Sequence, residues 1–417
     1  MHAVTTEGVL RRKRSQPLHL FVLGFSVVAA LALALGTMLS AAQAETLGDY
    51  DFTKVADSTE DGFDPSSFGC TSINTRGDIA FRAGRVAPDG FNTIPGIYRV
   101  NAADGSLTTI VEDQKRFVSI GFNPSMNDLG QVSFAATLAA EDKQTGDNIE
   151  AILRGAGKKL TTIATTADEF NFFGFDTSIN DSGEVAFKAE LDNGDEGLFS
   201  GRGGKKSGVT THYLNSSDVS LDEQPERFVG NDSRPSINNV GEIAFDESIQ
   251  PNFDLGIFVG REGTFQTIAA PDPDVSVQEP VLNDEGTAAF VRSFFDEASQ
   301  QFVEEIVTVS GDTLTTVADT RGQFGSFGFR PPSLNNQGEV AFLATLDDGT
   351  TGIFVGPDPV EDRVIATGDT LDGEEVTSLT FCEEGFNDSG QLTFTAFYED
   401  PDTFETRAAV FRATPLP

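Results

Sequence analysis

The chain repeats a short pattern, N-x-x-G-x-x-x-F, seven times at intervals of 45 to 58 residues. The asparagines that open the seven units are Asn74, Asn127, Asn180, Asn238, Asn283, Asn335 and Asn387. A glycine follows each of them by three positions: Gly77, Gly130, Gly183, Gly241, Gly286, Gly338 and Gly390. A phenylalanine follows by seven positions: Phe81, Phe134, Phe187, Phe245, Phe290, Phe342 and Phe394. Periods of this length are typical of propeller blades and other repeat arrays.

Each unit predicts a tight turn followed by a strand. Asparagine at the first position and glycine at the fourth are typical of a type I turn in which the glycine takes a positive φ. Such a turn closes a short hairpin with a bulge. Val185 and Phe187 then share one face of a strand, and Ala186 and Lys188 share the other. We predict that the asparagines and glycines are structural turn residues and that the seven phenylalanines are buried.

The third repeat shows four short strand signals, at 175–179, 184–189, 197–200 and 209–213. Related signals recur in the other repeats, and their β-branched residues, phenylalanines and glycines argue against helices. Four strands in about fifty residues make one propeller blade. The sequence therefore predicts an all-β fold: a seven-bladed β-propeller of four-stranded antiparallel blades.

The two ends of the repeat region complement each other. The last repeat stops after a third-strand signal at 409–412, whereas residues 52–58, ahead of the first repeat, resemble the fourth-strand segment at 314–320. Placed beside 409–412, the N-terminal strand leaves no exposed edge between the first and last blades. We predict that this strand closes the ring.

The two cysteines occupy nearly equivalent places in the first and last repeats, which are neighbours only in a closed ring. Cys70 lies four residues before Asn74, and Cys382 lies five before Asn387. In an exported protein this placement predicts a disulfide. The one-residue offset matters because the bond needs Cα atoms within about 7 Å. Two buried free thiols are the alternative.

The seven copies resemble those of a bacterial exported tandem-repeat family defined by the N-x-x-G-x-x-x-F pattern, over about residues 50–413. Members of that family often carry C-terminal anchors. This sequence shows no such segment, so surface attachment by that route is not expected. The resemblance implies a repeat propeller and implies no activity.

Residues 1–44 have the pattern of an export signal peptide. A basic cluster at 11–14 precedes an apolar run at 20–39, and Ala42-Gln43-Ala44 is a cleavage site of the A-x-A type before Glu45. The apolar run is also long enough for an uncleaved N-terminal membrane anchor. We predict a secreted or periplasmic protein, with membrane anchoring as the alternative, and one propeller domain at 45–417.

The net charge limits the possible partners. The chain carries −37 at neutral pH, and removing the basic export segment makes the remainder more negative. This charge argues against nucleic acid and, after signal cleavage, against an anionic membrane surface. The acids are scattered through loops, which favours solubility in high salt over the collection of cations. We expect a monomer whose partner is a protein or an extracellular polymer.

The chain outside the export segment shows no recognisable catalytic motif. His212 is its only histidine, in a strand segment where a partly exposed side chain is expected, and Ser-His-Asp catalysis would have to use it. No P-loop, HExxH or G-x-S-x-G pattern occurs. We therefore predict no catalytic residues and no cofactor-binding residues.

Calcium is the one cofactor that the sequence leaves open. Acidic turns at 60–64, 192–197 and 347–349 offer oxygen ligands, but none has the spacing of an EF-hand loop. Solvated surface turns are the simpler interpretation, so no metal ligand is predicted.

Loop lengths indicate which face carries the function. The connections from the second to the third strand and from the fourth to the next first strand vary most, and in an antiparallel blade they emerge on one face. The insertions at 83–93, 139–150 and 294–305 should share that rim, opposite the seven turns. Arg234 and Arg330 precede inner strands and are expected near the channel mouth, paired with neighbouring acids.

These features favour a binding scaffold that uses the variable-loop face. The alternative is a hydrolase or lyase that acts on an extracellular polymer through carboxylates at the channel mouth. A cluster of two or three buried acids with strongly raised pKa values at one end of the channel would favour the enzyme.

Overall fold

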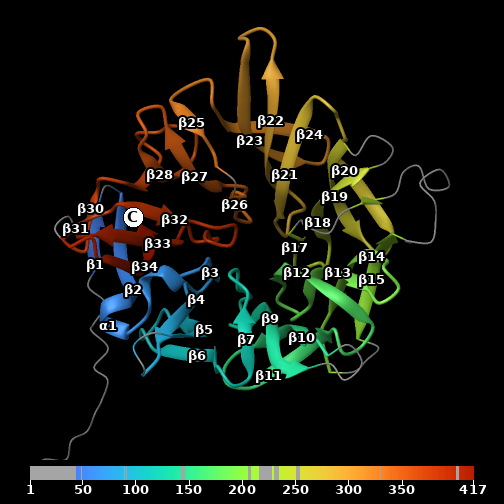
Figure 1. The fold of residues 1–417 in the computed structure, drawn as a ribbon. Helices are drawn as coiled ribbons and strands as arrows, with labels where there is room; N and C mark the ends of the chain where they lie inside the picture. Colours follow the sequence, from blue (N-terminus) through green and yellow to red (C-terminus); the bar gives the residue numbers. More distant parts are fainter. Residues whose placement is uncertain are drawn as a thin grey trace, which may run out of the picture. The chain divides into compact units, whose positions relative to one another are not determined.

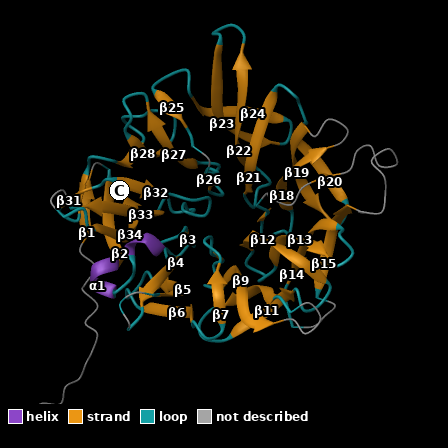
Figure 2. Ribbon diagram, in the orientation of Figure 1, coloured by secondary structure: helices purple, strands orange, loops and turns teal. Residues whose placement is uncertain are grey.

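Seven antiparallel sheets stand around a central axis (Figure 1), and the strands make up nearly all of the regular structure (Figure 2). The structure is a computed structural model that describes residues 44–47, 49–88, 90, 92–141, 146–204, 208–215, 228–229, 234–249, 254–328, 330–400 and 403–417. The predicted export segment therefore lies outside the described residues, apart from Ala44. Within the described part of the chain, no helix has the length and apolar character needed to cross a membrane.

The first four blades follow one another along the chain. Blade 1 consists of β3 (Thr71–Ile73), β4 (Ile79–Val86), β5 (Thr93–Val100) and β6 (Leu107–Glu112). Blade 2 consists of β7 (Phe117–Ile120), β8 (Ser125–Met126), β9 (Val132–Glu141), β10 (Asn148–Gly155) and β11 (Leu160–Thr165). Blade 3 consists of β12 (Phe170–Ile179), β13 (Val185–Leu191), β14 (Glu196–Gly201) and β15 (Val209–Asn215). Blade 4 consists of β16 (Phe228–Val229), β17 (Ser236–Ile237), β18 (Ile243–Ile249), β19 (Asp254–Arg261) and β20 (Thr264–Ala269).

The last three blades complete the ring. Blade 5 consists of β21 (Val275–Leu282), β22 (Ala288–Asp296), β23 (Gln301–Ser310) and β24 (Thr313–Asp319). Blade 6 consists of β25 (Phe324–Ser326), β26 (Ser333–Leu334), β27 (Val340–Leu346), β28 (Thr351–Val355) and β29 (Arg363–Ala366). Blade 7 consists of β32 (Ser378–Thr380), β33 (Leu392–Glu399), β34 (Thr406–Pro415), β2 (Tyr50–Asp57) and β1 (Ala44–Leu47). The short elements outside the blades are α1 (Ser58–Asp61), a 3₁₀ turn (Pro65–Ser67), β30 (Thr370–Leu371) and β31 (Glu374–Glu375).

The predicted fold class is confirmed, with differences in the strand lengths. The four strands predicted for the third repeat are all present, and the innermost, β12, starts five residues earlier than expected. The inner strands of blades 2, 4 and 6 are each split into two short pieces that pair with the same neighbour. The predicted long loop at 83–93 was wrong, because β4 extends to Val86 and β5 starts at Thr93. The insertion at 294–305 is likewise mostly strand, in a hairpin of β22 and β23 that extends past the neighbouring blades in Figure 1.

The N-terminal strand lies where the sequence places it. β2 pairs with β34 in antiparallel register, with Phe52 opposite Ala413 and Asp57 opposite Ala409. The sheet continues to a fifth strand, β1, which pairs with the outer edge of β2. That β2 holds the ring closed remains a prediction.

Charged side chains fasten β2 to its own blade. Arg407 on β34 donates to Asp57 at 2.9 Å and to Glu374 at 2.5 Å, and Lys54 pairs with Asp372 at 3.0 Å. Asp57 is 1% exposed. Burial alone raises the pKa of this carboxyl, but hydrogen bonds from Arg407 and Thr59 outweigh burial and leave the pKa well below its usual range. The ionised network therefore stabilises the sheet at neutral pH.

Each motif asparagine closes its own turn. In all seven turns the Asn Oδ1 accepts a hydrogen bond from the backbone N–H four residues on, at 2.9 or 3.0 Å. The glycine three residues after the asparagine has φ between 70° and 85° in every copy, which glycine adopts without the cost that a Cβ imposes. The hydrogen bond and the positive φ therefore explain why asparagine and glycine occupy these two positions of the motif.

The same asparagines also join the blades to one another. Each Nδ2 donates to the backbone carbonyl of the asparagine in the next blade, at 2.8 to 3.5 Å, and Asn387 donates back to Asn74. The seven side chains are only 2–5% exposed. One residue type thus forms a closed circle of hydrogen bonds around the axis, which we call the asparagine ring.

A second set of polar contacts runs beside the asparagine ring. Five blades carry a serine two residues before the asparagine, and its Oγ accepts from a backbone N–H of the next blade at 3.0 to 3.2 Å. The serines are Ser72, Ser125, Ser178, Ser236 and Ser333. These bonds fix the height of each inner strand relative to the next.

The apolar core lies between neighbouring blades. Ile97 and Ile110 of blade 1, for example, pack in one cluster with Val132 and Phe134 of blade 2. All seven motif phenylalanines are at most 2% exposed. Burying such a side chain stabilises the fold by about 1.5–3 kcal/mol relative to leaving it in water.

The dual role of the asparagines can be tested at Asn283. Asn283→Ala removes the bonds to Thr287 N and Asn335 O and leaves both groups buried without that partner. We expect a loss of about 2–4 kcal/mol in the free energy of unfolding, measured by urea denaturation. The control is Asn193→Ala, which removes a cap of an exposed turn between β13 and β14 and should cost less than about 1 kcal/mol. Equal losses of unfolding free energy in the two variants would contradict the claim that the asparagine ring stabilises the fold.

Candidate functional site

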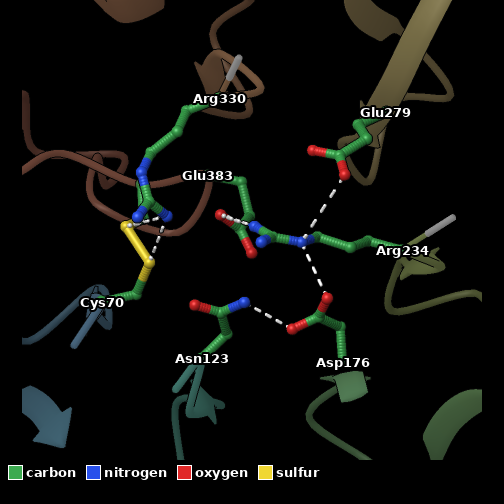
Figure 3. The surroundings of a disulfide bond; sticks show 8 residues. Cys70, Asn123, Asp176, Arg234, Glu279, Arg330 and Glu383 are labelled. Carbon is green, nitrogen blue, oxygen red and sulfur yellow. Dashed lines mark hydrogen bonds and ion pairs between the residues drawn. A yellow bond between two sulfur atoms is a disulfide. The ribbon is translucent and has the colours of Figure 1, made fainter. Parts of the chain in front are cut away.

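The inner strands begin at the end of the channel opposite the seven turns, and one side chain per blade gathers there. Six of the seven lie four residues before the motif asparagine, and Arg330 in the sixth blade lies five residues before it. They are Cys70, Asn123, Asp176, Arg234, Glu279, Arg330 and Glu383. Figure 3 shows these side chains, which we call the mouth ring, converging from seven blades. Five of them are charged, which makes the mouth ring the leading candidate for a functional site.

A cavity of about 180 Å³ lies at the mouth ring. Asp176, Arg234, Glu279 and Glu383 line it, together with Glu384. Its deeper lining consists of the apolar residues directly before the motif asparagines: Ile73, Met126, Ile179, Ile237, Leu282, Leu334 and Phe386. Sites for drug-sized ligands measure roughly 300–1,000 Å³. The channel cavity therefore suits one small group rather than a long polymer segment.

Arg234 is the centre of the mouth ring. Its Nε donates to Asp176 at 2.9 Å and its Nη1 donates to Glu383 at 3.0 Å, while Glu279 lies 3.8 Å from Nε. Burial lowers the pKa of the guanidinium, but the charges of Glu383, Asp176 and Glu279 outweigh burial and raise the pKa above its ordinary value. The structure thus pairs Arg234 with acids from three other blades.

Two glutamates in the channel cavity have strongly raised pKa values. Burial raises the pKa of Glu279 to about 7, opposed by Arg234 and assisted by the charge of Glu383. Burial also raises the pKa of Glu384 to about 7. Its carboxylate accepts from Ser125 Oγ at 2.5 Å and Ser72 Oγ at 2.7 Å, and these bonds oppose the shift. Both groups are therefore partly protonated at neutral pH.

A disulfide joins the first and last blades beside Arg234. Cys70 and Cys382 are bonded, with Cα atoms 5.7 Å apart, so the one-residue offset does not prevent the bond. Arg330 Nη1 lies 3.1 Å from the sulfur of Cys70 and 3.5 Å from that of Cys382. Glu383 lies near the two sulfurs, but sulfurs held in a disulfide offer no thiolate to a metal ion.

The expected exposure of His212 was wrong, because the side chain is 4% exposed. Its Nδ1 accepts from the backbone N–H of Glu262 at 3.0 Å, so Nε2 carries the proton and donates to Ser200 Oγ at 2.9 Å. Ser200 donates its own proton to Glu184 at 2.5 Å. The histidine therefore does not accept the serine proton, as a Ser-His nucleophile would require.

The acidic turns considered for calcium bind their own backbone. Asp348 Oδ1 accepts from Thr350 N at 2.9 Å, Asp61 Oδ2 accepts from Asp57 N at 2.9 Å, and Asn193 Oδ1 accepts from Asp195 N at 3.1 Å. Among the residues that the structure describes, the only close group of three candidate ligands is the disulfide pair with Glu383. These turns do not gather a ligand set.

An exposed apolar surface adjoins the mouth ring on blades 2 and 3. Phe122 is 61% exposed and Phe175 is 73% exposed, and they directly precede Asn123 and Asp176 of the mouth ring. A groove of about 120 Å³ lies between the two blades, lined by Ile120, Phe122, Ala136, Phe173 and Phe175 among others. We call it the aromatic groove.

Sequence reasoning located Arg234, Arg330 and the cysteines but missed the rest of the site. The missing signal was available, because residues four and five positions before each motif asparagine can be compared across the seven copies. That comparison yields the acids Asp176, Glu279 and Glu383 and the phenylalanines Phe122 and Phe175. It does not show which of them are exposed, since this depends on how the blades pack.

One family model matches most of the chain. The sequence pattern of the family described as "Family of unknown function (DUF7453)" matches residues 53–318 and, in a second alignment, 113–411. No curated protein matches the chain. The match leaves the resemblance to the N-x-x-G-x-x-x-F family a prediction.

Solved structures with a similar fold share little sequence with this chain. An acylaminoacyl peptidase of Pyrococcus horikoshii matches with a TM-score of 0.47 and 12% identity over 82% of this chain; the chain spans about half (52%) of the peptidase. The propeller domain of the Trilobed protease of Pyrococcus furiosus has a TM-score of 0.46 and 11% identity, covering 83% of this chain and 94% of the domain. The oligogalacturonate lyase of Vibrio parahaemolyticus has a TM-score of 0.44 and 10% identity, covering 77% and 98%. No activity is transferred from these likenesses.

The raised pKa of Glu384 predicts a pH dependence of stability. A carboxyl whose pKa rises on folding binds protons more tightly in the folded state, so stability falls as pH rises from about 4.5, the unfolded value, to about 7. Glu384→Gln should therefore show a smaller fall in Tm between pH 5 and pH 8 than the parent protein. Glu285→Gln, at an exposed glutamate, is the control and should keep the parent slope. Identical slopes in all three proteins would refute the assignment.

The disulfide predicts a redox dependence of stability. It closes a loop of 312 residues, which stabilises by roughly 6 kcal/mol on the chain-entropy model if the bond is unstrained. Reduction should lower the urea midpoint of the parent protein accordingly and leave a Cys70→Ser/Cys382→Ser variant unaffected. Alkylation of two thiols in the unreduced, denatured protein, detected by mass spectrometry, would rule the bond out.

Proposed function

This chain belongs to the family of unknown function DUF7453, and we propose that it is an exported binding scaffold. On this proposal the variable-loop face holds a protein or an extracellular polymer, and the seven turns on the opposite face supply rigidity. The aromatic groove beside the mouth ring is the observation that carries the proposal.

Three exposed large apolar side chains, Val118, Phe122 and Phe175, lie at or beside the groove. Val118 is 56% exposed, and it belongs to the same strand edge as the lining residue Ile120. Phe172 stacks edge-on against Phe175 with ring centroids 5.9 Å apart. Contiguous apolar surface on a soluble protein marks an interaction site, because leaving it in water is unfavourable. Aromatic residues are also enriched at protein interfaces.

The polar groups of the mouth ring and Glu384 in the channel cavity support recognition in a fixed geometry. Arg234 is held by Asp176 and Glu383, and Glu384 is held by two serine hydroxyls. Side chains held in this way lose little conformational entropy when a partner binds, which favours affinity.

A carboxylate-dependent hydrolase or lyase is the second candidate. Glu279 and Glu384 have pKa values of about 7 and line one cavity. Two buried acids with raised pKa values at one end of the channel are the arrangement expected of an enzyme. Carboxyl groups tuned to this range are suited to general acid–base chemistry at neutral pH. The small volume of the channel cavity and the engagement of both oxygens of Glu384 favour the scaffold.

Binding can be tested with a panel of peptides and polysaccharides presented to the immobilised protein. Phe122→Ser/Phe175→Ser should weaken the retained interactions at least about tenfold, since interface aromatics commonly carry the binding energy. Phe302→Ser is the matched control, because Phe302 is 80% exposed but lies on β23 of blade 5. Retained binding by the double variant, or equal loss in the control, would overturn the assignment to this face.

The same panel separates the scaffold from the enzyme. A bound polymer should keep its chain length over hours at pH 5 to 8. Shortening of the polymer that disappears in Glu279→Gln would establish the second candidate instead. Binding without shortening supports the scaffold.

A further inference from the structure

We propose that the aromatic groove takes an apolar side chain of a basic polypeptide segment, whose ammonium or guanidinium groups then face the carboxylates of the mouth ring. This inference rests on the proposed binding function and names the chemistry of the partner. Three observations carry it: the size of the groove, the state of its polar groups and the charge beside it.

The groove has the volume of one side chain. Its 120 Å³ is close to the cavity of about 150 Å³ that admits benzene in a well-studied engineered core. Phe122 and Phe175 form exposed parts of its lining, so an aromatic or branched aliphatic side chain would cover both rings. Burying this apolar surface supplies the affinity.

The polar groups of the groove have partners within the protein. Ser119 Oγ donates to Thr137 Oγ1 at 2.9 Å, and Glu150 Oε2 accepts from Phe173 N at 3.2 Å. A sugar ring placed here would find part of the hydrogen-bonding capacity of these groups already used within the protein. The groove therefore favours an apolar side chain over a saccharide.

The charge beside the groove favours a cationic segment. Asp176 follows Phe175 in the chain and shares the mouth ring with Glu279 and Glu383, whereas Arg234 and Arg330 are its only cationic members. The chain's net charge of −37 also steers cations towards the protein.

The test uses three short peptides on the purified full-length protein. The probes are acetyl-Gly-Lys-Phe-Lys-Phe-Lys-Gly-amide, its counterpart with glutamate in place of lysine, and its counterpart with serine in place of phenylalanine. Titration calorimetry at 50 mM salt should show the Lys-Phe peptide binding at least about tenfold more tightly than either counterpart. Binding should weaken at 500 mM salt because the charges are screened.

Variants assign the binding to the groove. Phe122→Ser/Phe175→Ser should lose at least about tenfold in affinity for the Lys-Phe peptide, and Phe302→Ser should lose none. Because both phenylalanines are exposed, the double variant should keep the parent Tm, which checks its folding.

Each failure has a distinct meaning. Equal affinity of parent and double variant places the peptide elsewhere and overturns the inference. Equal affinity for the Glu-Phe peptide overturns the basic partner and leaves the scaffold standing. Phenylalanine-dependent binding of a neutral polysaccharide such as dextran, without peptide binding, replaces the polypeptide by a saccharide. If no peptide binds, the inference fails, while the panel described above still decides the scaffold by itself.

Discussion

Seven buried side-chain hydrogen bonds, each from an asparagine to the backbone carbonyl of the asparagine in the next blade, hold the inner strands in one circle. The chemistry demands asparagine at this position. Its Oδ1 accepts from the turn of its own blade while its Nδ2 donates to the neighbour, whereas aspartate lacks the donor and glutamine is one methylene longer. Because donor and acceptor belong to the same motif residue in successive blades, every inner strand takes the same height along the axis. A slipped blade would leave two buried polar groups without partners.

The mouth ring follows from this common height. Residues a fixed number of positions ahead of each asparagine must meet at one level around the channel, although 45 to 58 residues of chain separate them. Seven identical charges at that level would repel one another strongly in a partly buried site. The seven positions instead combine three acids, two arginines, an amide and one half of a disulfide, so that Arg234 offsets its acidic neighbours. The repeat thus keeps the turns and inner strands alike, whereas the side chains of the mouth ring differ from blade to blade.

Several covalent and polar links join blades 7 and 1. Asn387 donates to Asn74 O at 2.8 Å, Glu384 accepts from Ser72, Ile73 N donates to Glu384 O at 2.9 Å, and the disulfide joins the same two blades. The chain itself also connects these two blades, from β2 of blade 7 through α1 to β3 of blade 1. Glu384, which makes two of the polar links, also lines the channel cavity.

The sequence by itself determined the number of blades, the turn at the end of each inner strand, the burial of the motif phenylalanines and the pairing of 52–58 with 409–412. These properties depend on local turn chemistry and on the repeat period, and both can be recognised in the sequence.

Only the tertiary structure determined which side chains of neighbouring blades contact one another and which stay exposed. His212 is buried because the neighbouring chain covers it, which strand alternation does not reveal. Phe122 and Phe175 are exposed beside the channel mouth, although large apolar residues in or next to an inner strand are ordinarily expected inside. The ring brings distant segments of the chain to one axis. Only for this reason can each asparagine Nδ2 donate to the next blade, and only for this reason do the charged side chains of the mouth ring meet: Asp176, Arg234, Glu279 and Glu383.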